Sequence, residues 1–239
     1  MSRHERVGAG TDAAGWAPAP AVPAALTTPR MAGLVGVAFA FLFGAVLVLM
    51  HGSLTTEMGA DVLTAGGSRT RLGIATMLMP FAGIAFLWFI AVVRDGMGRA
   101  EDRFYSTVFL GSGLVFLAIM FVAMALAAGL IVASQHGESP LPVGVTHFGA
   151  GVAVAASKTY ALRMGAVFMI SLATIWRKTD LMPRWLVLVT YVSALALLAI
   201  SDLSAWITLA FPVWVLVVSV VILLRPGRTG APAVVPADG

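Results

Sequence analysis

The sequence predicts an all-α integral membrane protein: a polytopic transmembrane helix bundle of six spans with both termini in the cytoplasm. Of its 239 residues, 59% are hydrophobic and 11% are charged, whereas globular domains carry about 25% charge. Several apolar runs reach the roughly 20 residues that cross a bilayer. The basic residues are also concentrated in the two tails and in every second connection between the expected spans. The absence of cysteine excludes disulfides and thiolate chemistry.

The apolar runs divide residues 31–224 into a transmembrane domain between two polar tails. Residues 1–30 and 225–239 are rich in Pro, Gly and Ala and are predicted to be disordered. The first apolar run is longer than the roughly 7–15 residues of a signal-peptide core, so it is interpreted as an uncleaved span. The expected spans are 31–50, 72–93, 104–133, 159–176, 185–201 and 204–224.

The fourth apolar run is interrupted by Lys158 and Arg163. Because a charge at the bilayer centre costs at least about 2.5 kcal/mol, both residues are expected near one end of the span. A span that starts at Thr159 allows both side chains to reach the surface. Residues 150–158 would then form an interfacial helix, after a loop over residues 135–149.

Two prolines and one serine predict where helices bend or begin. Pro80 lies near the middle of the second span and is expected to kink it, and Pro212 is expected to bend the sixth. Ser204 is a candidate N-cap for the sixth span. The third span exceeds the hydrocarbon thickness and is expected to tilt or protrude.

Small residues recur along the first and third spans. Ala32, Gly36, Ala40 and Gly44 follow at intervals of four, which places them along one side of a helix. Such a side allows close approach of another helix, and a neighbour from the same chain is favoured over another subunit. The third span carries further small residues at Gly111, Gly113, Ala123, Ala125, Ala127 and Gly129.

The connection between the second and third spans is a charged turn. Its charged residues are Arg94, Asp95, Arg99, Glu101, Asp102 and Arg103. Six alternating spans place this turn and both tails, with most of the 15 Lys and Arg residues, on one side. The positive-inside rule makes that side the cytoplasm.

The other side collects histidines, acids and four bases. His51, His136 and His147 are candidate metal ligands, although their spacing matches no metal motif. The remaining outer polar cluster is Glu57, Asp61, Arg69, Arg71, Glu138, Lys158, Arg163 and Asp202. Mutual charge pairing at the water boundary is the favoured interpretation. The alternatives are a divalent metal, a haem held by two histidines, and an anionic ligand or lipid headgroup on the bases; no cofactor is predicted outright.

The central hairpin resembles a family of uncharacterised actinobacterial membrane proteins. The resemblance covers the residues Met79–Phe89, Val93–Asp95, Glu101–Phe104 and Leu110–Gly113. It implies a multi-pass protein of the bacterial plasma membrane and carries no activity with it.

No catalytic constellation is present in the sequence. It contains no nucleophile elbow, no nucleotide-binding loop and no paired carboxylates within a span. We therefore expect a non-enzymatic membrane component that packs with itself or with a partner protein in the lipid bilayer, without contact to nucleic acid. A small-solute or lipid translocator is the first alternative, and a metal- or haem-binding subunit is the second.

Overall fold

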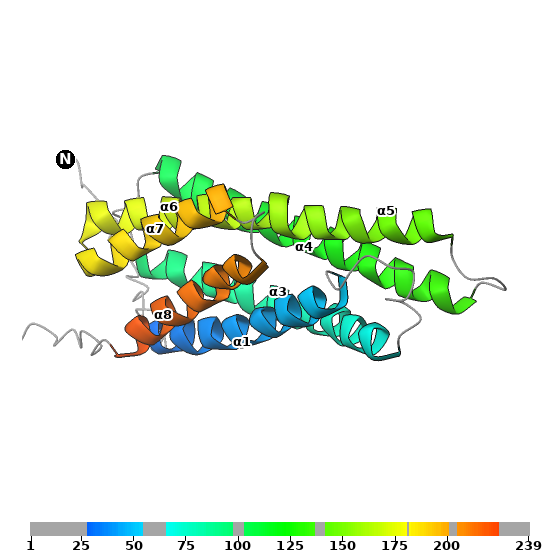
Figure 1. Ribbon diagram of the computed structural model, residues 1–239. Coiled ribbons are helices and arrows are strands. Elements are labelled where there is room, and N and C mark those ends of the chain that lie inside the picture. Colours follow the sequence, from blue (N-terminus) through cyan, green and yellow to red (C-terminus); the bar gives the residue numbers. More distant parts are fainter. Residues whose placement is uncertain are drawn as a thin grey trace, which may run out of the picture.

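The computed structural model describes residues 28–54, 66–97, 103–136, 142–180, 182–200 and 205–224, and helices make up nearly all of them (Figure 1). The all-α class is therefore confirmed for this part of the chain. The α-helices are α1 (Thr28–Leu54), α3 (Gly66–Met97), α4 (Arg103–His136), α5 (Val143–Val154), α6 (Leu162–Thr179), α7 (Arg184–Ile200) and α8 (Ala210–Leu224). A π-helix, η2 (Ala155–Ala161), joins α5 to α6, and a 3₁₀ helix, η3 (Ala205–Leu209), precedes α8.

Five helical stretches are long and apolar enough to cross a membrane. They are Gly33–Leu54, Gly67–Asp95, Phe104–Gln135, Val143–Thr179 and Trp206–Leu224. The remaining helix, α7, is apolar but has only 17 residues, which corresponds to about 25 Å at the α-helical rise. The described chain is thus an apolar helical bundle of the integral membrane type.

The helices form two layers (Figure 1). In one layer α1 packs extensively along α3 and also along α8. In the other, α4 packs against α5, η2 and α6, and α6 packs against α7. Contacts between α3 and α4 connect the layers. Figure 1 shows α4 and α5 continuing together past the end of α1, so this hairpin is the longest part of the molecule.

The fourth apolar run differs from the prediction. A continuous helical stretch covers Val143–Thr179, so the expected loop is wrong for residues 143–149 and no break separates 150–158 from the span. Pro142 stands immediately before the first turn of α5, where the missing amide hydrogen removes no helical bond. Gly149 is packed against Leu130 of α4, and this contact supports the helix despite its glycines.

The other helices also extend beyond the expected spans. The helix α1 begins at Thr28, within the expected tail, because Pro29 falls in the first turn where proline is tolerated. The helix α3 begins at Gly66 and α4 continues to His136. Hydropathy identifies only the apolar part of each helix, which can lie in the hydrocarbon. The hydrogen-bonded helix continues beyond that part into the neighbouring polar residues.

The two prolines occupy different positions in their helices. Pro80 is exposed inside α3, and helix continues on both sides of it; the kink expected there stays a prediction. Pro212 is the third residue of α8, directly after η3. Because first-turn amides have no partner within a helix, proline fits there, and the change of helix type lies just before it. The candidate cap Ser204 lies outside the described residues.

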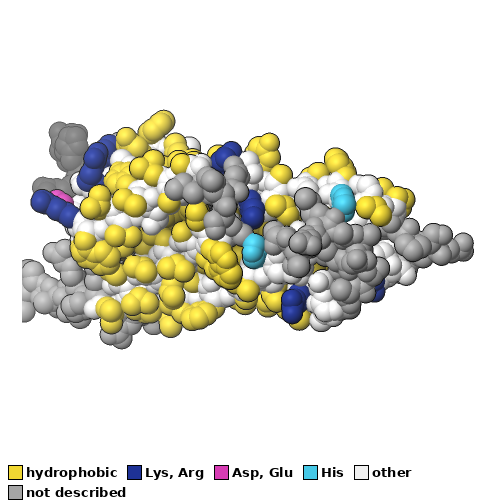
Figure 2. Space-filling view, viewed as in Figure 1, with side chains coloured by type: hydrophobic (Ala, Val, Ile, Leu, Met, Phe, Trp, Pro, Cys, Tyr) yellow, Lys and Arg dark blue, Asp and Glu magenta, His cyan; other side chains and the backbone are white. Residues whose placement is uncertain are grey.

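Figure 2 shows hydrophobic side chains over much of the visible surface, between basic side chains at one end and a second group of basic and histidine side chains beyond the middle. On α3 the uncharged run between Arg71 and Arg94 measures about 33 Å at 1.5 Å per residue. This length matches the roughly 30 Å of bilayer hydrocarbon. The polar ends of the bundle are therefore spaced as two membrane surfaces are.

Candidate functional site

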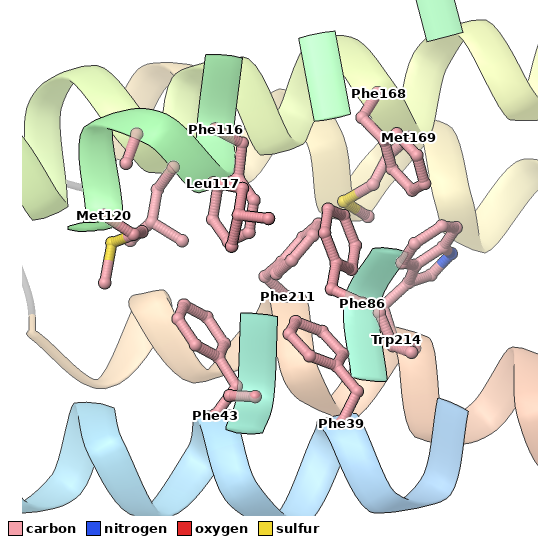
Figure 3. Close-up of a cluster of buried hydrophobic side chains, with 14 of the residues drawn as sticks. Phe39, Phe43, Phe86, Phe116, Leu117, Met120, Phe168, Met169, Phe211 and Trp214 are labelled. Carbon is pink, nitrogen blue, oxygen red and sulfur yellow. The ribbon is translucent and has the colours of Figure 1, made fainter. Parts of the chain in front are cut away.

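Aromatic rings fill the middle of the bundle. Phe86 of α3 lies at centroid distances of 4.7 Å from Phe39, 5.2 Å from Phe116 and 5.3 Å from Phe168. Phe211 of α8 lies 4.8 Å from Phe116. These rings converge from both layers (Figure 3), and most pairs are tilted or edge-on, as the ring quadrupole favours. The centre of the bundle is therefore a packed aromatic core.

Hydroxyl groups inside the bundle are hydrogen-bonded. Ser171, Thr190 and Ser219 each donate to the carbonyl four residues earlier, which satisfies a polar group inside an apolar helix. Thr190 also accepts a 2.8 Å hydrogen bond from the indole Nε1 of Trp214. This buried bond joins α7 to α8 next to the aromatic core.

Several glycines of the bundle are packed against neighbouring helices. A Cβ at Gly36 would meet Ser219 of α8 and Phe89 of α3, and one at Gly113 would meet Ile90 of α3 and Phe168 of α6. The expectation that the small-residue side of the first span packs within the chain is confirmed at Gly36. At Gly44 a Cβ would find no atom within 4 Å, so the packed part of that side ends before it.

One side of α4 faces away from the bundle. Gly111 and Gly129 lie on it, and a Cβ at either position would meet no atom of the part of the chain that the structure describes within 4 Å. Ala118 and Ala125 are exposed on the same side. We call the stripe formed by Gly111, Val115, Ala118, Val122, Ala125, Gly129 and Val132 the open face of α4, and the exposed Leu114 and Phe121 flank it. Of the small residues expected on the third span, Gly113, Ala123 and Ala127 are instead buried.

A small cavity lies where His51 of α1 meets η2. Its polar lining comes from His51, Ser157, Lys158 and Thr208. The cavity measures about 10 Å³, which is at the lower limit for one water molecule. His51 also lies 5.7 Å from the ring of Trp206. The structure thus brings His51 and Lys158 of the expected outer groups to one place, in a cavity much too small for a haem.

The π-helix η2 changes the expected relation between Lys158 and Arg163. An α-helix does not place residues five apart on one stripe, but in η2 the amide of Leu162 bonds the carbonyl of Ser157, five residues earlier. A π-turn brings residues at this spacing close to the same side. Both basic side chains are half-buried. The sequence offers no simple signal for a π-turn, so this arrangement was not predicted.

The three candidate histidines are not brought together by any contact in the described residues. His147 lies on α5, roughly 15 Å along the helix from Ser157, which lines the cavity with His51. Its buried Nε2 makes no hydrogen bond within the described residues. The side chain of His136 lies outside the described residues. Within that part of the chain no three His, Asp or Glu residues are grouped to hold a metal, and the metal site stays a prediction.

Much of the outer polar cluster lies outside the described residues, namely Glu57, Asp61, Glu138 and Asp202. Arg69 is half-buried and Arg71 is exposed in the first turns of α3. The serine hydroxyl of Ser53, at the end of α1, donates to the carbonyls of Leu49 and Ser68. This contact holds the end of α1 against the start of α3, beside the two arginines.

At the opposite end of α3, Arg94 and Asp95 are exposed. The other residues of the charged turn are not described in side-chain detail: Arg99, Glu101, Asp102 and Arg103. The same end of the bundle has a groove between α6 and α7 that was not predicted from the sequence. The sequence feature that could have pointed to it is the neighbouring pairs Trp176-Arg177 and Arg184-Trp185, which flank the polar turn.

Comparison with known proteins gives no match: no protein-family model, no curated protein and no solved structure is significantly similar to this chain. The resemblance of the central hairpin to actinobacterial membrane proteins therefore stays a prediction.

Proposed function

We propose that this chain is a non-enzymatic membrane component that associates with a second copy of itself through the open face of α4. In this proposal it crosses the bilayer six times, with both termini in the cytoplasm. The observation that carries the proposal is the exposed surface at Gly111 and Gly129, where an added Cβ would meet no atom of the described residues within 4 Å.

The spacing on the open face supports a helix pair. Its exposed residues recur at alternating intervals of four and three from Gly111 to Val132, which is the heptad spacing of left-handed helix pairs. All of them are Gly, Ala or Val. Helices in lipid associate through van der Waals contact, and small residues allow their backbones to approach closely. The same face on an identical chain fits because both copies insert in one orientation and can meet about a twofold axis.

The packed aromatic core favours association over translocation. A solute that crossed through the bundle would have to displace Phe86, Phe116 and Phe211, which are fully buried. These rings come from three helices in both layers, so opening a path requires separating the layers. The two alternatives, a translocator and a metal- or haem-binding subunit, have no comparable support in the described residues.

The helix directions support the six-span topology. The end of α3, the start of α4, the end of α6 and the start of α7 lie at one end of the bundle (Figure 1). That end carries Arg94, Arg177, Lys178 and Arg184. Reporter fusions after residues 99 and 178 should therefore be active in the cytoplasm, and a fusion after residue 202 should be active outside. A cytoplasmic signal at residue 202 would refute the six-span topology.

Replacement of the glycines on the open face tests the association. In the Gly111→Leu/Gly129→Leu double variant, the new side chains should hold the two α4 helices apart. The dimer fraction in lipid nanodiscs or vesicles, measured by single-molecule photobleaching, should fall at least about tenfold. The matched control is Gly44→Leu/Gly73→Leu, because a Cβ added at these glycines of α1 and α3 would also meet no atom of the described residues within 4 Å. The proposal is contradicted if the wild-type chain is monomeric, or if the dimer fraction falls equally in the two double variants.

A further inference from the structure

An open groove of about 420 Å³ lies between the end of α6 and the start of α7. It is lined by Trp176, Arg177, Asp180, Met182, Arg184, Val187, Leu188 and Tyr191. We call it the α6–α7 groove. Nothing in the proposed association uses it, because its residues belong to neither α4 nor the open face.

The backbone of the turn brings two arginines to this groove. Asp180 follows α6 with φ of 50°, a left-handed conformation that ends the helix and reverses the chain. The carbonyl of Pro183 accepts hydrogen bonds from the amides of Leu186 and Val187, which begins α7. Arg177 and Arg184 therefore stand on the two sides of one short turn. Both are exposed.

The groove combines positive charge with an apolar wall. The lining contains two arginines and one carboxylate, that of Asp180, so its net charge is positive. Lys178, next to Arg177, places its ammonium 4.3 Å from the centre of the Tyr105 ring. On the α7 side, Leu188 is 64% exposed. A ligand for this groove should therefore carry both an anionic group and a hydrocarbon chain.

The position of the groove identifies the ligand. The apolar stretch of α6 ends at Trp176, and that of α7 begins beside the exposed Trp185. Tryptophan concentrates at the boundary between hydrocarbon and headgroups, so the groove lies where lipid phosphates lie. Guanidinium groups bind phosphate through paired hydrogen bonds. A lipid chain would then extend from the headgroup along Leu188 toward the bilayer centre.

We infer that the α6–α7 groove binds an anionic phospholipid, with its phosphate on Arg177 and Arg184 and an acyl chain against Leu188. This inference rests on the membrane embedding of the bundle and is independent of association through α4. A dimer that fails to form would leave it unchanged.

Native mass spectrometry of the detergent-purified full chain tests the inference. Phosphatidylglycerol should bind the wild type more tightly than phosphatidylcholine does. The Arg177→Gln/Arg184→Gln double variant should bind phosphatidylglycerol about tenfold more weakly, as expected for the loss of two basic contacts to an anionic lipid. The control is Arg71→Gln/Arg94→Gln, which removes the same charge from exposed positions outside the groove. Unchanged binding in the groove variant, or an equal loss in the control, overturns the inference.

Two further measurements distinguish a lipid from free phosphate. Leu188→Ala should weaken phosphatidylglycerol binding several-fold, whereas Leu195→Ala should leave it unchanged. Leu195 is the matched control because it lies two turns further along α7 and is 60% exposed, compared with 64% for Leu188. Millimolar inorganic phosphate should fail to displace the lipid. If phosphate displaces it, or if Leu188→Ala has no effect, the groove is a simple anion site and the lipid assignment is wrong.

Discussion

The two faces of α4 are both apolar and both carry glycines, but their surroundings differ. On the inner face, Gly113 meets Ile90 and Phe168, and Phe116 lies within the aromatic core. On the outer face, a Cβ added at Gly111 or Gly129 would find no atom within 4 Å among the described residues. Because lipid is as apolar as a protein core, hydrophobicity does not distinguish these faces. The difference is one of shape: side chains of α3 and α6 pack beside Gly113, and no described side chain packs beside Gly111 or Gly129.

The largest expected effect separates a core ring from a lipid-facing ring on the same helix. Phe86→Ala should lower the free energy of unfolding by about 3–5 kcal/mol, because it leaves a cavity among five aromatic neighbours. Phe81→Ala is the control, since Phe81 is 62% exposed and Phe86 is 0% exposed. Unfolding in mixed detergent micelles measures both. Equal losses would mean that the aromatic core does not determine the stability of the bundle.

A smaller effect should distinguish the glycines of the two faces directly. In Gly113→Ala the new methyl would lie 2.8 Å from Ile90 and 3.1 Å from Phe168. We therefore expect the free energy of unfolding to fall by about 1–3 kcal/mol. Gly111→Ala should be neutral or slightly stabilising, because alanine is the better helix former and no atom lies near. Melting temperatures of the two purified variants check this. Similar losses at both positions would remove the distinction between the faces.

The smallest effect concerns the buried polar link between α7 and α8. Thr190→Val removes the acceptor of the 2.8 Å hydrogen bond from Trp214. We expect the free energy of unfolding to fall by about 1 kcal/mol, which is in the range measured for hydrogen bonds between membrane helices. Thr190→Ser keeps the hydroxyl and should retain most of the stability. Unfolding curves of the purified variants measure the change. If valine and serine behave alike, the hydrogen bond contributes nothing measurable.

The sequence predicted the helical class and the membrane character because long apolar runs such as 104–133 have no other stable setting. It also predicted that small residues such as Gly36 pack within the chain. It could not separate Gly111 from Gly113, since both lie in the same apolar run two residues apart. Only the direction in which α4 faces its neighbours distinguishes them, and this depends on tertiary packing.

The missed features have local causes. Pro140 and Pro142 mark a break in the sequence and led to the prediction of a loop, but packing on α4 keeps residues 143–149 helical. Lys158 and Arg163 predict the start of a span, whereas they accompany a π-turn inside a longer helix. Both errors come from judging a segment by its own composition. Contacts with α4 override that composition.

Disulfide formation through α4 in membranes tests the central claim most directly. The chain contains no cysteine, so Ala118→Cys and Ala125→Cys each introduce a single thiol on the open face. Ile84→Cys on α3 and Val192→Cys on α7 are lipid-facing controls, with exposures of 54% and 59% for the native side chains. Under mild oxidation, non-reducing electrophoresis should show dimers for the two α4 variants and monomers for the controls. Monomers for all four variants, or equal dimer yields at all four positions, would contradict association through the open face.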